Sequence, residues 1–362
     1  MAAGQVREGA DIFDQQQLHS SGLRQAGNLA PFGNATTGFC LMHGIAAALL
    51  SHVPLVAYPY RGENCACNLC GGTAATVVCR YDRRLKPLTT VSCDGCGLMR
   101  TDPMPSEDEL GRYYASNYRL DYQLARNGTP PRLHLKRSRA EAAARFDLLA
   151  GYLRPGSQVL DLGSGSGEFL DILARAGHEA MGIEPGRDFA RYARATYGAS
   201  VIGASWQDTD LPAASFDLIS AQHVLEHLRE PVDALRRLAH WLAQDGFIHV
   251  EVPNAAATRH DPLQQFHFAH VHHFTPDTLI SAAERAGLVF HAGGYPSPTT
   301  MIFRKLRPGE TPVRRAPDQA RPPLKLGTLS PGGYLLSGRW AMNAIRRARG
   351  FLRDSGRPST VG

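Results

Sequence analysis

Four cysteines arranged as two C-x-x-C pairs offer metal-binding chemistry. Cys67 and Cys70 lie in "CNLCGG", Cys93 and Cys96 lie in "CDGCGL", and 22 residues separate the pairs. A glycine follows the second cysteine of each pair, which lets backbone amides approach the thiolate sulfurs. Four thiolates around one tetrahedral ion make a closed structural zinc site, with no position left for catalysis. The spacing therefore predicts a structural Zn²⁺ ion held by these four cysteines.

Two alternatives to this metal site stay open. The 22-residue gap slightly exceeds the usual spacing of a zinc ribbon, so the thiols could also remain without metal, and Cys65 could replace Cys67 as a ligand. Three of the seven cysteines, Cys40, Cys65 and Cys79, lie outside the pairs. This odd number does not indicate a disulfide framework. It suits a reducing compartment, so we expect a cytoplasmic protein.

Two histidine-containing segments offer proton-transfer chemistry. "HVLEH" contains His223, Glu226 and His227, and "FHFAHVHHF" further along contains His270. Histidine changes charge near neutral pH, which suits the deprotonation of a hydroxyl or of an acidic C–H group. If a helix begins by residue 223, His223 and His227 lie on one helical face, and Glu226 can orient a histidine or accept a substrate hydroxyl. We predict that this cluster is catalytic, although each histidine taken alone is more simply explained as a structural residue.

A glycine-rich turn offers a binding place for a cofactor. "VLDLGSGSGEFL" joins a strand-like run to a helical pattern, and its Gly163, Gly165 and Gly167 permit unusual backbone angles and close approach of a ligand. The helix N-terminus behind them favours a negative group. Glu184 closes the next strand-like run, 23 residues after Asp161, where a carboxylate can accept hydrogen bonds from ribose hydroxyls.

Two cofactor classes use a turn of this kind. A dinucleotide fingerprint needs G-x-G-x-x-G, but the position of its third glycine is Glu168. The spacing here is D-x-G-x-G-x-G instead. A turn that only packs a helix on a strand is the structural alternative to both cofactors.

Alternating apolar runs and amphipathic stretches indicate the elements that position these residues. The strand-like runs are 158–162, 179–183, 200–203, 216–220, 247–252, 288–293 and 300–306. The helical patterns are 138–153, 167–176, 187–197, 231–243 and 276–286. The last follows Thr275, a favourable N-cap, and starts with Pro276, a favourable first-turn residue. This order predicts an α/β fold with a doubly wound, Rossmann-like, seven-stranded and mainly parallel sheet.

The H-x-x-E-H spacing in "HVLEH" also matches the inverted zinc-peptidase signature. That site needs a helix-borne metal centre and a further ligand in a different fold. The predicted strand order therefore argues against a peptidase.

At this point the chain resembles the class I S-adenosylmethionine-dependent methyltransferases over about residues 140–306. Five segments follow that family's order: "VLDLGSGSGEFL", "GIEPGRDFARYAR", "LPAASFDLISAQHVLEHLREPVDAL", "LAQDGFIHVEVPN" and "FAHVHHFTPDTLISAAERAGL". The resemblance implies that Asp161 and the loop 163–167 hold the methionine moiety of S-adenosylmethionine and that Glu184 binds its ribose. Asp208 would lie near the adenine, with Gln207 at a place that is often acidic in relatives.

The segment after the second cysteine pair carries a further resemblance. "CGLMRTDPMPSEDELGRYYASNY" is similar to the zinc-binding front module of sugar and glycan C-methyltransferases. This similarity implies that the module builds one wall of the substrate cleft through Tyr113, Tyr114 and Tyr118, whose alternative role is core packing. The printed sequence does not contain the long carboxyl-terminal domain of the sugar enzymes, so deoxysugar C-methylation does not follow from the resemblance alone.

The resemblance implies a methyltransferase acting on a small molecule, most plausibly a saccharide or a lipid-linked glycan intermediate. Methyl transfer would proceed by in-line displacement with histidine-assisted deprotonation. An RNA methyltransferase that grips RNA through its zinc ribbon is the first alternative. It is disfavoured because "SAQHVLEH" lacks the Pro-Pro-aromatic motif of base-amino methylases. A cofactor-binding scaffold without catalysis is the second alternative.

Charge is unevenly placed along the chain. Residues 304–362 hold 13 Lys/Arg and three acidic residues, a net of +10, so residues 1–303 carry −4 of the total +6. This distribution argues against a nucleic-acid partner for the whole domain. The basic amphipathic pattern 334–354 suits peripheral contact with an anionic membrane, while packing on the enzyme or on a second subunit is the alternative. We find no transmembrane pattern.

The predicted organisation has five parts. They are a marginal N-terminal extension (1–62), a zinc-ribbon module (63–100), a linker that forms a substrate wall (101–137), the S-adenosylmethionine-binding domain (138–306) and the basic tail (307–362). Met42 is a second candidate for the translation start, which would leave residues 1–41 outside the protein.

Overall fold

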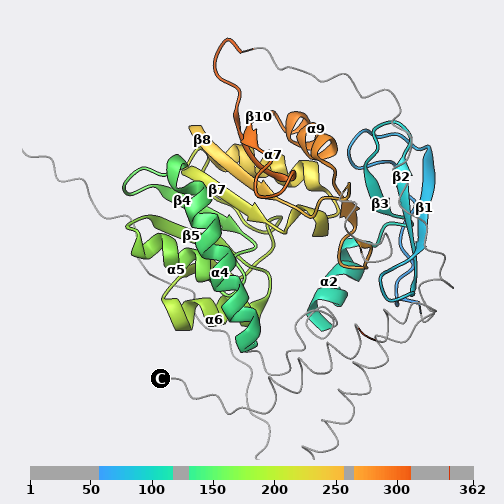
Figure 1. Ribbon diagram of the computed structural model, residues 1–362, viewed down its shortest axis with the longest axis horizontal. Coiled ribbons are helices and arrows are strands. Elements are labelled where there is room, and N and C mark those ends of the chain that lie inside the picture. The colour runs from blue at the N-terminus through green and yellow to red at the C-terminus, as the bar shows by residue number, and fades with distance from the viewer. Residues whose placement is uncertain (1–56, 117–129, 257–264, 311–341, 343–362) are drawn as a thin grey trace, which may run out of the picture. The chain divides into compact units, whose positions relative to one another are not determined.

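The computed structural model describes residues 57–116, 130–256, 265–310 and residue 342 (Figure 1). The predictions for the N-terminal extension before residue 57 and for the basic amphipathic helix, apart from Met342, lie outside the described residues. Membrane contact through that helix stays a prediction. Within the described ranges, no helix is long and apolar enough to span a bilayer.

A seven-stranded mixed sheet forms the larger part of the described structure, in the order β10-β11-β8-β7-β4-β5-β6. Its strands are β4 (Gln158–Leu162), β5 (Glu179–Ile183), β6 (Ser200–Ile202), β7 (Phe216–Gln222), β8 (Leu242–Glu251), β10 (Leu288–Gly293) and β11 (Thr300–Lys305). The five strands from β8 to β6 run parallel, whereas β10 and β11 add an antiparallel edge. The predicted Rossmann-like α/β fold is confirmed.

Helices cover both faces of this sheet (Figure 1). One face packs against α4 (Arg132–Leu149) and α5 (Glu168–Arg175), and the other packs against α7 (Pro231–Trp241) and α9 (Pro276–Arg285). Adjacent strand residues point to opposite faces: Val159 joins the α4/α5 cluster, whereas Leu160 joins the α7/α9 cluster. Helix α6 (Arg187–Tyr197) packs beside α5. This two-faced burial explains the continuous apolar runs in the sequence.

Helix boundaries follow local chemistry. Thr275 caps α9 in a reciprocal capping box with Thr278, as its residue type predicts. Helix α4 begins at Arg132, directly after Pro131, rather than at the predicted residue 138. Proline lacks an N–H and has a fixed φ, so it suits a helix start. Helix α7 ends at Trp241 instead of 243 because Leu242 adopts an extended backbone and starts β8.

A smaller four-stranded antiparallel sheet carries the cysteine pairs, in the order β1-β2-β3-β9. Its strands are β1 (Ala75–Tyr81), β2 (Pro87–Cys93), β3 (Met99–Thr101) and β9 (His272–His273), and helix α2 (Glu107–Ser116) follows β3. The fourth strand therefore comes from the segment after β8, far along the chain. Leu69 and Leu98, beside the cysteines, belong to the same buried cluster as α7 and α9. The small sheet thus shares its core with the larger one.

We predict that Gly182→Ala destabilises the fold, because Gly182 lies in β5 directly beneath the glycine-rich turn. A Cβ at this position would lie 2.3 Å from Ser164 Oγ and 2.8 Å from Leu170 Cδ1. Such overpacking costs about 1–3 kcal/mol. Urea unfolding should show the loss. Gly151→Ala is the matched control, since an added Cβ there meets nothing within 4 Å; equal stability of the two variants would contradict the prediction.

Candidate active site

The glycine-rich turn between β4 and α5 has the backbone that its sequence predicts. Gly163, Gly165 and Gly167 have φ angles of 74°, 54° and 90°, in the left-handed region that favours glycine. An added Cβ at Gly167 would lie 2.7 Å from Ala193, so this glycine permits close packing of α6. An added Cβ at Gly165 would meet nothing within 4 Å, so this side of the glycine faces open space. The turn therefore leaves its middle accessible to a ligand.

Val224 joins the glycine turn to the histidine segment. A Cβ on Gly163 would lie 2.6 Å from Val224 Cγ2, so the two residues are in direct contact. Strands β4 and β7 are parallel neighbours, and their carboxyl ends meet at one sheet edge. This edge is where ligands bind in open α/β sheets.

Glu184 lies directly after β5 and close to the turn. Its carboxylate accepts hydrogen bonds from the backbone N–H groups of Gly165 at 2.9 Å and Gly186 at 2.7 Å. These bonds hold the carboxylate at the mouth of the turn, beside the open face of Gly165. A ribose with adjacent hydroxyls suits this arrangement, so the residues fit the nucleoside end of S-adenosylmethionine.

The other two predicted cofactor residues have protein partners. Asp161 is buried in β4 and pairs with Arg145 of α4, with Nη1 to Oδ1 at 2.9 Å. Asp208 lies on an exposed loop after β6, where it accepts a hydrogen bond from Ser205 Oγ at 2.8 Å. Direct contact of either carboxylate with a cofactor stays a prediction. Arg145 is a partner that the sequence did not indicate.

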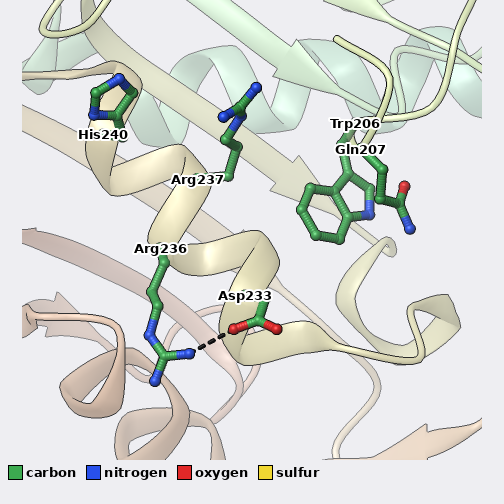
Figure 2. Close-up of a pocket in the computed structure, with 6 residues that line it drawn as sticks. All are labelled: Trp206, Gln207, Asp233, Arg236, Arg237 and His240. Carbon is green, nitrogen blue, oxygen red and sulfur yellow. Dashed lines mark hydrogen bonds and ion pairs between the residues drawn. The ribbon is translucent and has the colours of Figure 1, made fainter. Parts of the chain in front are cut away.

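A pocket of about 470 Å³ lies beside this loop, as Figure 2 shows. Trp206 and Gln207 of the loop lie across from side chains of α7. The α7 side chains are Asp233, Arg236, Arg237 and His240. None of the predicted catalytic residues lines this pocket.

His223 begins the histidine segment directly after β7. It has a φ of 55°, which is unusual for a residue with a side chain. Its N–H donates to the Glu251 carbonyl at 2.8 Å, and its side chain is 48% exposed, so a substrate can reach it. Burial lowers the pKa of His223, but contact with the Glu226 carboxylate outweighs this effect and raises the pKa above its usual value.

The segment does not continue as a helix from His223. Leu225–His227 forms a short 3-10 turn, and α7 begins only at Pro231. The condition for placing His223 and His227 on one helical face is therefore not met. The turn instead directs both histidines to Glu226, with ring nitrogens 3.4 Å and 3.8 Å from its Oε1.

His270 joins the same group from the segment before β9. Its Nε2 lies 3.8 Å from Glu226 Oε1, and its ring centroid lies 4.7 Å from that of His227. Burial lowers the pKa values of His227 and His270 below the usual range. The structure thus brings together all four predicted catalytic residues.

Tyr114 of α2 contacts the histidine group through its hydroxyl. Its hydroxyl lies 2.8 Å from His227 Nδ1 and donates to the Ala269 carbonyl at 3.2 Å. Tyr113 instead packs against Phe268, and Tyr118 lies outside the described residues. Of the predicted wall tyrosines, Tyr114 is the one shown at the histidines.

The four paired cysteines gather at the other end of the small sheet. Cys67 Sγ lies 3.6 Å from Cys96 Sγ, and Cys70 Sγ lies 3.4 Å from Cys93 Sγ. A tetrahedral ion with Zn–S bonds of about 2.3 Å would separate its sulfurs by about 3.8 Å. The four thiols therefore fit one such ion. Cys65, the alternative ligand, is not part of this group.

The cysteine turn also contacts the segment that precedes α9. Asn68, between the first two cysteines, donates to Glu230 Oε1 at 3.0 Å and lies 3.3 Å from His272 Nε2. His272 Nδ1 donates to the Leu228 carbonyl at 2.9 Å. Local sequence patterns do not indicate these contacts because they join residues far apart in the chain.

Comparison with known proteins identifies part of the chain. Residues 134–292 match the model of a family described as a methyltransferase domain. A Mycobacterium tuberculosis protein named "Probable S-adenosylmethionine-dependent methyltransferase" is 27% identical over 36% of this chain and 48% of its own length. The "Ubiquinone biosynthesis O-methyltransferase" of Albidiferax ferrireducens is 28% identical over 27% of this chain and 42% of its own. The chain thus spans about half the length of these relatives, or less.

Solved structures are similar at lower identity. A TehB-like S-adenosylmethionine-dependent methyltransferase from Corynebacterium glutamicum is 20% identical, with a TM-score of 0.35 over 47% of this chain and all of the other. One from Mesorhizobium loti is 18% identical, with a TM-score of 0.37 over 45% of this chain and 96% of the other. On this family match, residues 134–292 form a methyltransferase domain, and the sheet they build is the Rossmann-like α/β sheet described above.

Proposed function

We propose that the protein transfers a methyl group from S-adenosylmethionine to a small-molecule acceptor, a saccharide or a lipid-linked glycan intermediate. One observation carries this proposal: Val224 places the histidine group directly against the glycine turn. The turn proposed for the cofactor and the proposed proton acceptors therefore lie at one sheet edge. Such alignment is the main requirement of a displacement reaction.

S-adenosylmethionine supplies a methyl group on a positively charged sulfur. In this protein the Glu184 carboxylate would bind the ribose hydroxyls, and the open face of Gly165 would admit the cofactor. His223 is exposed toward the site and can take the proton from an acceptor hydroxyl. The acceptor oxygen then forms its bond to the methyl carbon, while the electron pair of the broken C–S bond stays on sulfur.

The acceptor class rests on two supports. The printed names of several relatives specify O-methylation, which favours a hydroxyl oxygen as the acceptor atom. The segment that follows the second cysteine pair resembles the front module of sugar and glycan methyltransferases, and its Tyr114, on α2, reaches His227. A polar wall of tyrosine and histidine suits a hydroxyl-rich saccharide.

We also propose that the four paired cysteines hold a structural Zn²⁺ ion. The sulfur separations fit a tetrahedral ion, and all four sites would be filled by protein. The ion would brace the turn that carries Asn68, and through it the segment around His272.

The test of the main proposal is methyl transfer. Methyl-labelled S-adenosylmethionine is incubated with the protein and with pools of nucleotide sugars, lipid-linked glycans and RNA. We expect label in a saccharide fraction. His223→Gln should lower the rate by about 100- to 10,000-fold, the usual contribution of a general base. Its affinity for S-adenosylmethionine should be unchanged.

His240→Gln is the matched control, because His240 lies on α7 and is not one of the predicted catalytic or cofactor-binding residues, so this variant should leave transfer unchanged. Label found in RNA alone would contradict the saccharide acceptor. Binding of S-adenosylmethionine without transfer to any pool would contradict catalysis and favour a scaffold.

A second prediction concerns the cysteines. Cys93→Ser should remove one equivalent of zinc and lower the urea midpoint, since Leu69 and Leu98 beside the site belong to the shared core. Metal analysis and urea unfolding check both effects. Cys79→Ser, outside the cysteine group, should keep the zinc. An unchanged zinc content in Cys93→Ser would refute the proposed ligand set.

A further inference from the structure

We propose that Glu226, His227 and His270 form a second metal site, for a divalent first-row transition ion such as Zn²⁺ or Mn²⁺. One oxygen of Glu226 and one nitrogen from each histidine all lie within 4.8 Å of one another. This site is separate from the four cysteines, and no described residue belongs to both groups.

The first support is the state of the Glu226 carboxylate. The residue is 1% exposed, and neither of its oxygens accepts a hydrogen bond from any described residue. A buried carboxylate without such partners is strongly destabilising, and native proteins rarely contain one. Three histidine rings surround it instead, at 3.4–3.8 Å from Oε1. A bound cation would satisfy the carboxylate and explain its position.

The second support is the spacing of the ligand atoms. His227 Nε2 and His270 Nε2 each lie 3.8 Å from Glu226 Oε1. An ion with bonds of about 2.1 Å in tetrahedral geometry would separate its ligand atoms by about 3.4 Å. Closing these two distances by a few tenths of an ångström is within the reach of side-chain rotation, and the ligand nitrogens of the two histidines lie within 4.8 Å of each other.

The third support is the outer contact of His227. Its Nδ1 lies 2.8 Å from the Ala269 carbonyl, which can only accept a hydrogen bond, so Nδ1 carries the proton. The lone pair is then on Nε2, which faces Glu226. Histidines that bind metals commonly donate their other ring N–H to a carbonyl in this way. Ala269 directly precedes His270, so one short segment orients both imidazoles.

The ligand types select the kind of ion. Two imidazoles and one carboxylate suit zinc, manganese or iron, whereas magnesium and calcium prefer oxygen ligands alone. Three protein ligands leave at least one coordination position open. The side chains of His227 and His270 are each 15% exposed, so a small molecule can reach that position from solvent.

The role of this ion deepens the proposed function and rests on it. An acceptor oxygen bound at the open position would be held beside the glycine turn, and the ion would make its hydroxyl more acidic. His223, which the site does not use as a ligand, would remain as the proton acceptor. The acceptor would therefore be one that offers an oxygen to a metal, such as a sugar with adjacent hydroxyls.

Metal titration of the whole protein tests the site. Protein that carries one equivalent of zinc per chain is titrated with Co²⁺ and followed by visible absorption and by metal analysis. We expect one further equivalent per chain, with d–d bands but without the charge-transfer bands of cobalt bound to thiolates. Glu226→Gln and His270→Gln should weaken this binding by about 100-fold or more, since even outer contacts contribute about 10- to 100-fold.

Glu251→Gln and His223→Gln are the matched controls. Both residues lie beside Glu226 but outside the ligand set, so both variants should keep the second equivalent. Retained zinc at the cysteines shows that each variant is folded. Absence of a second equivalent in the wild type, or its survival in Glu226→Gln, would overturn the proposal. The proposal would also be overturned if His223→Gln lost the second metal equivalent while His270→Gln kept it. The ligands would then be the H-x-x-E-H residues His223, Glu226 and His227.

The affinity for S-adenosylmethionine is measured on the same samples. Cofactor binding without a second metal equivalent would refute this site and leave the proposed function intact. A second equivalent without cofactor binding would refute the proposed function and leave the metal site intact.

Discussion

The pairing of β3 with β9 is the interaction on which the candidate site depends. It joins the sheet that carries the cysteines to the segment that carries His270. His272 of β9 fixes the same segment from the other side, through the Leu228 carbonyl. Because both sides are held, His270 is presented to Glu226 together with His227. The cysteine-containing sheet therefore supports the segment that carries His270.

Contact between Val224 and Gly163 sets the second constraint. It requires a glycine in the cofactor turn and fixes the distance from that turn to the histidine group. His223, next to Val224, adopts a left-handed backbone at the end of β7, which is unfavourable for a residue with a side chain. Strained residues at a strand end, beside an accessible turn, are typical of functional sites. The same short segment after β7 therefore contacts the glycine turn and carries His223.

Periodicity and turn chemistry predicted most of the larger sheet. β4, β5 and β10 have the predicted bounds, and Thr275 caps α9 as expected. The short strand β9 was not predicted because two consecutive histidines carry no apolar alternation. A helix starting by His223 was the condition for a shared face of His223 and His227, and the structure has a 3-10 turn there instead, since the backbone follows tertiary contacts. Spacing along the sequence likewise does not show that Arg145 pairs with Asp161. Nor does it show that the buried Glu226 carboxylate accepts no hydrogen bond from a described residue. Both features follow from three-dimensional packing.

Calorimetric titration of the zinc-loaded protein with S-adenosylmethionine, and separately with NAD, shows which of the two binds at this sheet edge. We expect micromolar binding of S-adenosylmethionine, its loss in Glu184→Ala, and no heat with NAD. If NAD alone binds, the edge is not a site for S-adenosylmethionine, and the roles given to the histidines no longer hold.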